Sequence, residues 1–292
     1  MLCALPVLPC HAQSAGDEPE SPLTTVFPHS PTAPWWISGQ VNTIFQAHPD
    51  FHALYSGPNS LSAQAENATS IVLTLYTGYA FSERTEVLFD LESAGGGGLS
   101  DALGMAGFTN VDVVRNPTLG SKPYVARAMF HHVFALSKKE EDAERTPTWL
   151  LTRLPVRRLE VRAGKMSLAD YFDANAPGSD SHLQFLNWTA VNDGAYDYAA
   201  DTRGYTFAAV AEYQDRNWGL RFAVALMPKV ANGPQLDFNL SRARSENVEF
   251  ELRPELLKGK HTVARLLSYV NHANMGSYAE AVHCTHQRPT DR

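Results

Sequence analysis

Nine stretches of this chain alternate apolar with polar residues, and any fold that the chain adopts has to satisfy that two-residue period. Successive side chains of a β-strand point to opposite faces, so each stretch predicts a strand with one apolar and one polar face. In the first stretch, Ile37, Val41 and Phe45 share one face, and Ser38 and Asn42 share the other. The stretches are residues 35–46, 71–81, 84–92, 124–136, 158–163, 205–213, 218–226, 247–253 and 262–271. The sequence therefore predicts an all-β chain.

Composition narrows the fold class further. Hydrophobic residues make up 44% of the 292 residues, and no run approaches the roughly 18 to 20 apolar residues that a membrane helix needs. A transmembrane antiparallel β-barrel has the same average composition as a soluble protein, because lipid-facing and lumen-facing residues alternate. A soluble β-sandwich or jelly roll alternates in the same way.

Two features favour the barrel over the soluble alternatives. Charged residues follow the polar face along whole strands, as a water-filled lumen permits. Aromatic residues are predicted to cap the apolar face, as in a membrane-interface girdle. These are Trp36, Tyr79, Tyr124, Tyr205, Tyr213 and Trp218. Long and short connections also mix, as in barrels with long loops on one side and tight turns on the other.

The N-terminal segment and the charge balance bear on localisation and partners. Residues 1–12 read as a signal peptide, whose true start lies further upstream, and residues 13–34 as a flexible leader. Two of the three cysteines fall in the signal segment, so a disulfide framework is excluded. A net charge of −7 argues against nucleic-acid partners. An exported, cysteine-poor chain is typical of a bacterial envelope protein.

Three connections between the strands stand out. Gly95–Gly98 is expected to be a flexible hinge before a short helix start at 99–104, and lacks the features of a phosphate loop. Residues 138–149 are expected to form a charged turn. Residues 167–203 form the longest excursion and show no alternation.

Catalytic and metal chemistry find little support in the motifs. Asp193, Asp197 and Asp201 do not match a calcium loop, and the rings of His131 and His132 should point to opposite faces of one strand. The segment 283–286 contains two histidines and a cysteine, but no further ligand lies nearby in the sequence. We therefore expect no catalytic residues, no metal and no cofactor.

The predicted lumen carries arginines and carboxylates together. Sugar hydroxyls both donate and accept hydrogen bonds, so mixed charges and aromatic faces suit neutral carbohydrates. The simpler alternative is that these charges pair with one another and hold the lumen rigid. The candidate lumen residues are Arg84, Glu86, Asp90, Arg127, Arg158, Glu160, Arg162 and Arg221.

Several separated motifs between Trp35 and Tyr278 resemble the carbohydrate-selective outer-membrane porin family. They are GFTNVDVVRNP at 107–117, YVAR at 124–127, GKMS and DYFD within 164–173, SDSHLQF at 179–185, NW at 187–188, YDYAADTRGY at 196–205 and NHANM at 271–275. The resemblance implies a barrel of about sixteen strands in the bacterial outer membrane, through which sugars diffuse passively. It also implies a constriction of arginines and carboxylates, and we place further contacts at Arg127, Lys165, Asp173 and Trp188. The implied partners are mono- or oligosaccharides and outer-membrane lipid, with a homotrimer as the expected oligomer.

The chain departs from that family at its end. At the observed spacing, sixteen strands would need roughly 420 residues, so a truncated product of about nine strands is expected. Residues 35–281 would be the N-terminal two-thirds of the barrel domain, and 282–292 an out-of-family tail. The rival hypothesis is a periplasmic or secreted carbohydrate-active enzyme with Asp173, Asp193 or Asp197 as acid and base, or a sugar-binding protein on a β-rich scaffold.

Overall fold

The computed structural model describes residues 30, 32–55, 57, 60–102, 120–175, 196–254 and 262–275. This part of the chain is all-β apart from two short 3₁₀ turns, at Leu99–Ala102 and Leu168–Asp170. No helix in it is long and apolar enough to cross a membrane. The signal peptide, most of the leader and the tail that the sequence predicts lie outside the described residues.

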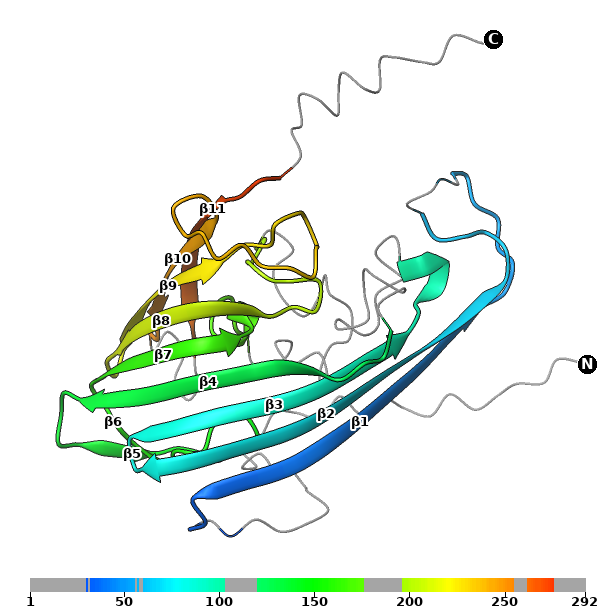
Figure 1. The fold of residues 1–292 in the computed structure, drawn as a ribbon. Helices are drawn as coiled ribbons and strands as arrows, with labels where there is room; N and C mark the ends of the chain where they lie inside the picture. Colours follow the sequence, from blue (N-terminus) through cyan, green and yellow to red (C-terminus); the bar gives the residue numbers. More distant parts are fainter. Residues whose placement is uncertain are drawn as a thin grey trace, which may run out of the picture.

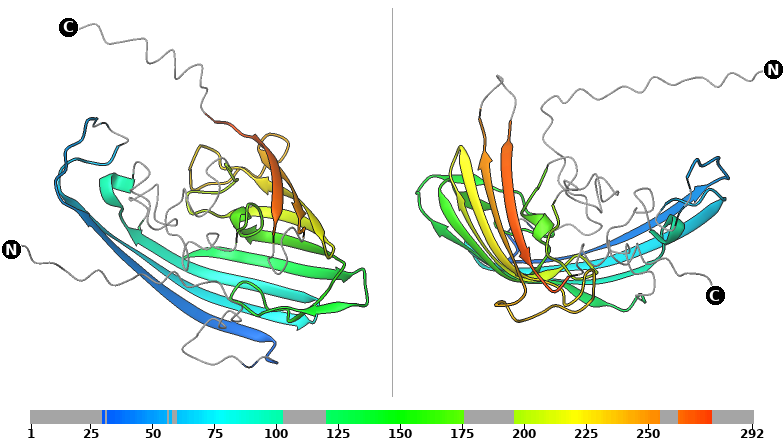
Figure 2. Two further views of the ribbon diagram at one scale, coloured as in Figure 1. Left: turned by 180° about the vertical axis from the view of Figure 1, so that it is seen from behind. Right: turned by 90° about the horizontal axis from the view of Figure 1, so that it is seen from above.

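Nine strands form one antiparallel sheet in which each strand pairs with its neighbours along the chain. All nine coincide with the stretches of alternation in the sequence, and the predicted fold class is confirmed. Figures 1 and 2 show that the sheet curls into an open trough, a partial barrel with β1 and β11 at its two edges. The strands are β1 (Trp35–His48), β2 (Glu66–Ser82), β3 (Thr85–Gly96), β4 (Tyr124–Ala135), β7 (Arg158–Met166), β8 (Thr206–Gln214), β9 (Trp218–Leu226), β10 (Arg244–Leu252) and β11 (Ala264–His272).

The two faces of the sheet differ as the alternation predicts. Large apolar side chains cover the convex face; Val41 is 73% exposed and Phe222 is 46% exposed. The concave face carries side chains that are almost fully buried, including Leu88 and Val133 together with many charged groups. A continuous apolar surface across nine strands is far larger than the patches that soluble monomers tolerate.

The lengths of the connections differ between the two ends of the sheet. At the end we call the turn end, β2–β3 and β8–β9 are joined by short turns at 83–84 and 215–217. At the opposite end, the loop end, the connections 49–65, 97–123, 167–205 and 227–243 are long. This separation of turns from loops matches the expectation for a barrel, except that two connections at the turn end, 136–157 and 253–263, are longer.

The longer of these two is the segment between β4 and β7, for which the sequence predicts a charged turn at 138–149. It instead forms a second, two-stranded sheet of β5 (Glu140–Asp142) and β6 (Arg153–Pro155), which lies beside the ends of β2–β4 (Figure 1). Residues 143–152, between these two strands, place Leu150 and Leu151 among the buried apolar side chains inside the trough. From the loop end, residues 167–175 pack Leu168 and Phe172 into the same interior.

Three of the six aromatics expected on the apolar face point inward instead. A β-bulge in β4 leaves Ala126 without a partner on β3, so the side chain of Tyr124 turns to the concave side and its hydroxyl donates to Glu92. Tyr205 precedes β8 and is buried, and Trp36 is buried with its indole N–H donating to Ser38 over 2.8 Å. The other three lie on the convex side: Tyr79, Tyr213 and Trp218.

Candidate functional site

The concave side of the sheet carries a continuous set of ionisable side chains, which we call the charged face. The two-residue period puts Arg158, Glu160 and Arg162 of β7 on this side together. The strand register then sets several of these charges beside a charge of opposite sign on the next strand, as in the pairs Glu212–Arg221 and Arg221–Glu249. The charged face comprises Glu86, Asp90, Glu92, Arg127, His131, Arg158, Glu160, Arg162, Glu212, Arg221, Glu249, Glu251 and Arg265.

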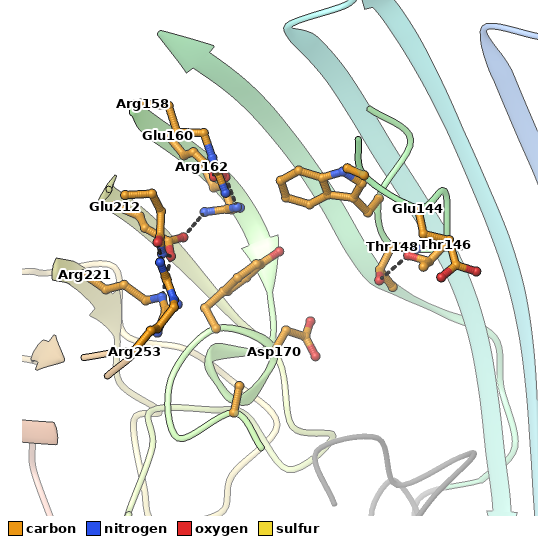
Figure 3. A pocket seen from close by; sticks show the side chains of 15 residues that line it. Glu144, Thr146, Thr148, Arg158, Glu160, Arg162, Asp170, Glu212, Arg221 and Arg253 are labelled. Atoms are coloured by element: carbon orange, nitrogen blue, oxygen red, sulfur yellow. Dashed lines mark hydrogen bonds and ion pairs between the residues drawn. The ribbon is translucent and has the colours of Figure 1, made fainter. Parts of the chain in front are cut away.

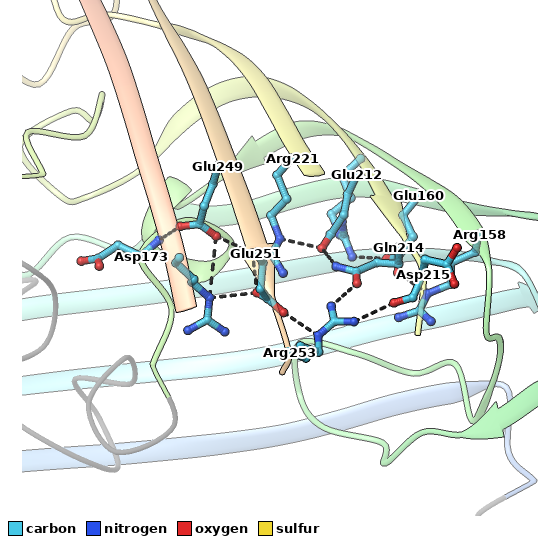
Figure 4. Close-up of polar contacts among 12 residues, drawn as sticks. Arg158, Glu160, Asp173, Glu212, Gln214, Asp215, Arg221, Glu249, Glu251 and Arg253 are labelled. Carbon is cyan, nitrogen blue, oxygen red and sulfur yellow. Dashed lines mark hydrogen bonds and ion pairs between the residues drawn. The ribbon is translucent and has the colours of Figure 1, made fainter. Parts of the chain in front are cut away.

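Ion pairs run across the charged face from β7 to β11. Arg162 Nη1 donates to Glu212 Oε2 over 2.9 Å, and Arg221 Nε donates to Glu212 Oε1 over 2.5 Å. Arg221 also pairs with Glu249, and with Glu251 at 3.1 Å. Figure 4 shows Glu160, Glu212, Arg221 and Glu249 in one row, with Arg253 below them. These residues pair with one another, as the simpler alternative expects.

A histidine lies between two carboxylates at the other side of the charged face. His131 is fully buried, with Nδ1 2.8 Å from Glu86 Oε1 and Nε2 3.1 Å from Glu160 Oε2. Both ring nitrogens of His131 therefore face a carboxylate oxygen. His132 faces the opposite side and packs between Phe130 and Phe134, so the predicted divergence of the two rings is confirmed.

The loop that follows β7 is tied to the wall of the trough. Arg127 of β4 donates to Asp90 of β3 and, from Nη2, to Asp170 Oδ2 over 2.6 Å. Asp173 adopts a left-handed conformation at φ 56°, and its backbone N–H donates to Glu249 over 2.7 Å. These contacts hold residues 167–175 against the charged face.

Two aromatic rings flank Arg162. The centre of the Trp149 ring lies 5.5 Å from the guanidinium carbon, and that of Tyr171 lies 4.8 Å from it. Burial raises the pKa of the Tyr171 hydroxyl to about 12. Trp149 comes from the turn end and Tyr171 from the loop end, so segments from both ends meet at one arginine.

A cavity of about 480 Å³ opens beside this arrangement. Figure 3 shows Arg158, Glu160, Arg162, Glu212 and Arg221 on one side of it, and Glu144, Thr146 and Thr148 on the other. Trp149 and Tyr171 also line it. Such a lining offers guanidinium donors, carboxylate and hydroxyl acceptors and aromatic faces within one space, the combination that polyols require.

Arg84 and Lys165, two further predicted site residues, do not line this cavity. Arg84 is in the β2–β3 turn rather than in a strand and pairs with Glu140 of β5. Lys165 lies near the loop end, 3.6 Å from Asp201. Trp188 and Asp193 lie outside the described residues. In the part that the structure describes, no cluster of three or more histidine, cysteine or carboxylate side chains could hold a metal ion.

Several residues of the site were not predicted. Glu212, Glu249 and Glu251 stand on the polar faces of predicted strands, and that alternation was the signal that could have found them. Trp149 and Tyr171 carry no such signal, because both stand in connections whose path the local sequence does not determine.

Comparison with known proteins rests on structure. No protein-family model matches the chain, and no curated protein matches it. The fold resembles that of OprB from Pseudomonas putida. The two structures superpose with a TM-score of 0.52 at 12% sequence identity, over 80% of this chain and 52% of OprB. The chain thus spans about half the length of OprB, and at this identity the likeness concerns the fold.

Proposed function

We propose that the chain is an outer-membrane porin, through which carbohydrates diffuse passively along the charged face, and that it is not an enzyme. The observation that carries this proposal is the opposition of the two faces: a continuous apolar convex surface behind a concave surface of paired arginines and carboxylates. Lipid suits the first surface and water the second. The likeness of the fold to OprB and the motif resemblance to carbohydrate-selective outer-membrane porins support the same assignment.

The arrangement of charges favours neutral hydroxylated solutes. Arg162 and Arg221 each bond to carboxylates, so no large excess of one sign attracts ions to the cavity. Sugar hydroxyls can exchange hydrogen bonds with such pairs as they pass, since each hydroxyl donates and accepts. The ring of Tyr171 offers an apolar surface for the C–H side of a sugar. Export through the predicted signal peptide and assembly as a homotrimer complete the proposal.

Liposome swelling tests this function. Purified protein is reconstituted into liposomes, which are diluted into isosmotic solutions of neutral sugars of increasing size. Swelling that is fast for small sugars and slows with sugar size is the expected result. Liposomes that carry membrane-inserted protein of high β-content and do not swell would overturn the proposal. Glycoside hydrolysis by protein that stays in buffer would support the rival enzyme.

A further inference from the structure

Residues 143–152 enter the interior of the trough from the turn end, a course that a simple strand connection does not require. Leu150 is 3% exposed and packs in the same cluster as Leu88 of β3 and Met129 of β4. A Cβ placed on Gly78 of β2 would approach Leu88 to 2.8 Å and Leu150 to 3.0 Å. The absence of a side chain at Gly78 therefore leaves the space that Leu150 occupies.

Polar contacts from two residues fix this segment. The backbone N–H of Leu150 donates to Glu86 Oε2 over 2.7 Å. The other oxygen of Glu86 faces His131, so one buried carboxylate connects the charged face to the segment. Nearer the turn end, Arg145 donates to the backbone oxygens of Ser30 and Trp35 over 2.8 and 3.1 Å.

The fixed segment presents Trp149 to the cavity. Its ring lies 4.8 Å from the ring of His131, and its indole N–H donates to the Leu151 oxygen over 2.7 Å. Trp149 stands in the connection from the turn end and Tyr171 in the connection from the loop end, so the two rings approach Arg162 from opposite ends of the sheet. Both rings line the cavity, so each borders the space that a solute beside Arg162 would occupy.

We propose that the segment 143–152 narrows the solute path from the turn end and that Trp149 is a specificity-determining residue that limits solute size. Glu86 is a positioning residue, which acts through the Leu150 N–H. This inference rests on the proposed porin function, but it concerns a different property: the size limit rather than the existence of the path.

The test compares size limits in liposome swelling. Trp149→Ala should raise the swelling rate for large sugars several-fold relative to the rate for small ones. Trp218→Ala, which removes a tryptophan from the convex face, is the matched control and should leave the ratio unchanged. Glu86→Ala should raise the ratio of the swelling rate for large sugars to that for small sugars, although Trp149 is still present. Glu86→Gln, which keeps an acceptor for the Leu150 N–H, should restore the wild-type ratio.

A second measurement adds bulk instead of removing it, so it does not depend on how Trp149→Ala folds. Thr148 lines the cavity and is exposed, and modification of Thr148→Cys with a bulky methanethiosulfonate should slow swelling by large sugars several-fold. The same modification at Asn217→Cys, an exposed turn position at the same end, should not. An unchanged size limit in folded Trp149→Ala and in modified Thr148→Cys would overturn the inference alone. A wild-type protein that admits no sugar would overturn the proposed function and this inference with it.

Discussion

Arg127 Nη2 on the wall strand β4 donates to Asp170 Oδ2 over 2.6 Å, and this contact joins the sheet to the loop that carries Tyr171. The same guanidinium bonds to Asp90 and is almost fully buried. A buried donor that loses its partner pays the full cost of its lost hydration. The contact therefore bears on the stability of the protein.

Asp170→Ala is expected to release residues 167–175 from β4. We expect a loss of about 1–3 kcal/mol in the free energy of unfolding, because Arg127 keeps only one of its two carboxylate partners. Denaturant titration followed by circular dichroism measures this loss. Asp142→Ala, which removes an exposed carboxylate from β5, is the control. An equal change in both variants would contradict the role of Asp170.

Arg221 compensates three carboxylates of the charged face at once: Glu212, Glu249 and Glu251. Arg221→Met keeps much of the side-chain volume but leaves these carboxylates without that charge, and should cost about 3–5 kcal/mol. This loss of stability is measured as the change in the free energy of unfolding in detergent. Arg216→Met, at an exposed turn position, should change stability by less than about 0.5 kcal/mol.

Phe222 follows Arg221 along β9, and a substitution at Phe222 tests the convex face of the sheet. Its side chain is on the convex surface near the middle of the strand, so under the proposed function Phe222→Arg would place a charge in lipid. We expect a loss of about 2–4 kcal/mol for folding into bilayers. Leu54→Arg, in the β1–β2 connection where Leu54 is 97% exposed, should have little effect. If Phe222→Arg folded into liposomes like the wild type, that face would not contact lipid.

The buried hydroxyl of Tyr171 predicts that the free energy of unfolding depends on pH. Burial raises the pKa of its hydroxyl from about 10 to about 12, so the folded state holds a proton that the unfolded state releases earlier. The contribution to stability is complete below pH 10 and is lost as the pH rises toward 12. The free energy of unfolding should fall more steeply over this range in the wild type than in Tyr171→Phe. If the free energy of unfolding changed equally with pH in the wild type and in Tyr171→Phe, the Tyr171 hydroxyl would be accessible to water.

The sequence predicted the strands and most of the charged face, because alternation is a local property that follows from strand geometry. Glu86, Asp90 and Glu160 were assigned to the polar side and are buried there. The opposite orientations of His131 and His132 follow from the same rule.

Features that depend on distant parts of the chain were not predictable in this way. The bulge at Ala126 reverses Tyr124 because β4 has one residue more than β3 at that point, which only the pairing of the strands reveals. Trp149 reaches the charged face because Glu86, 63 residues earlier in the chain, accepts a hydrogen bond from its neighbour Leu150. Charges such as Glu140 and Glu141 made this connection look like an exposed turn, and hid the apolar residues that follow.

Nitroxide accessibility along β1 in liposomes tests most directly whether one face of the sheet contacts lipid and the other lines a water-filled path. Single cysteines are placed at 37, 38, 40, 41, 42 and 45 after the three native cysteines are replaced by serine. The account predicts that labels at 37, 41 and 45 are relaxed by oxygen and those at 38, 40 and 42 by a water-soluble nickel chelate. Equal accessibility to the nickel chelate at all six positions would contradict it.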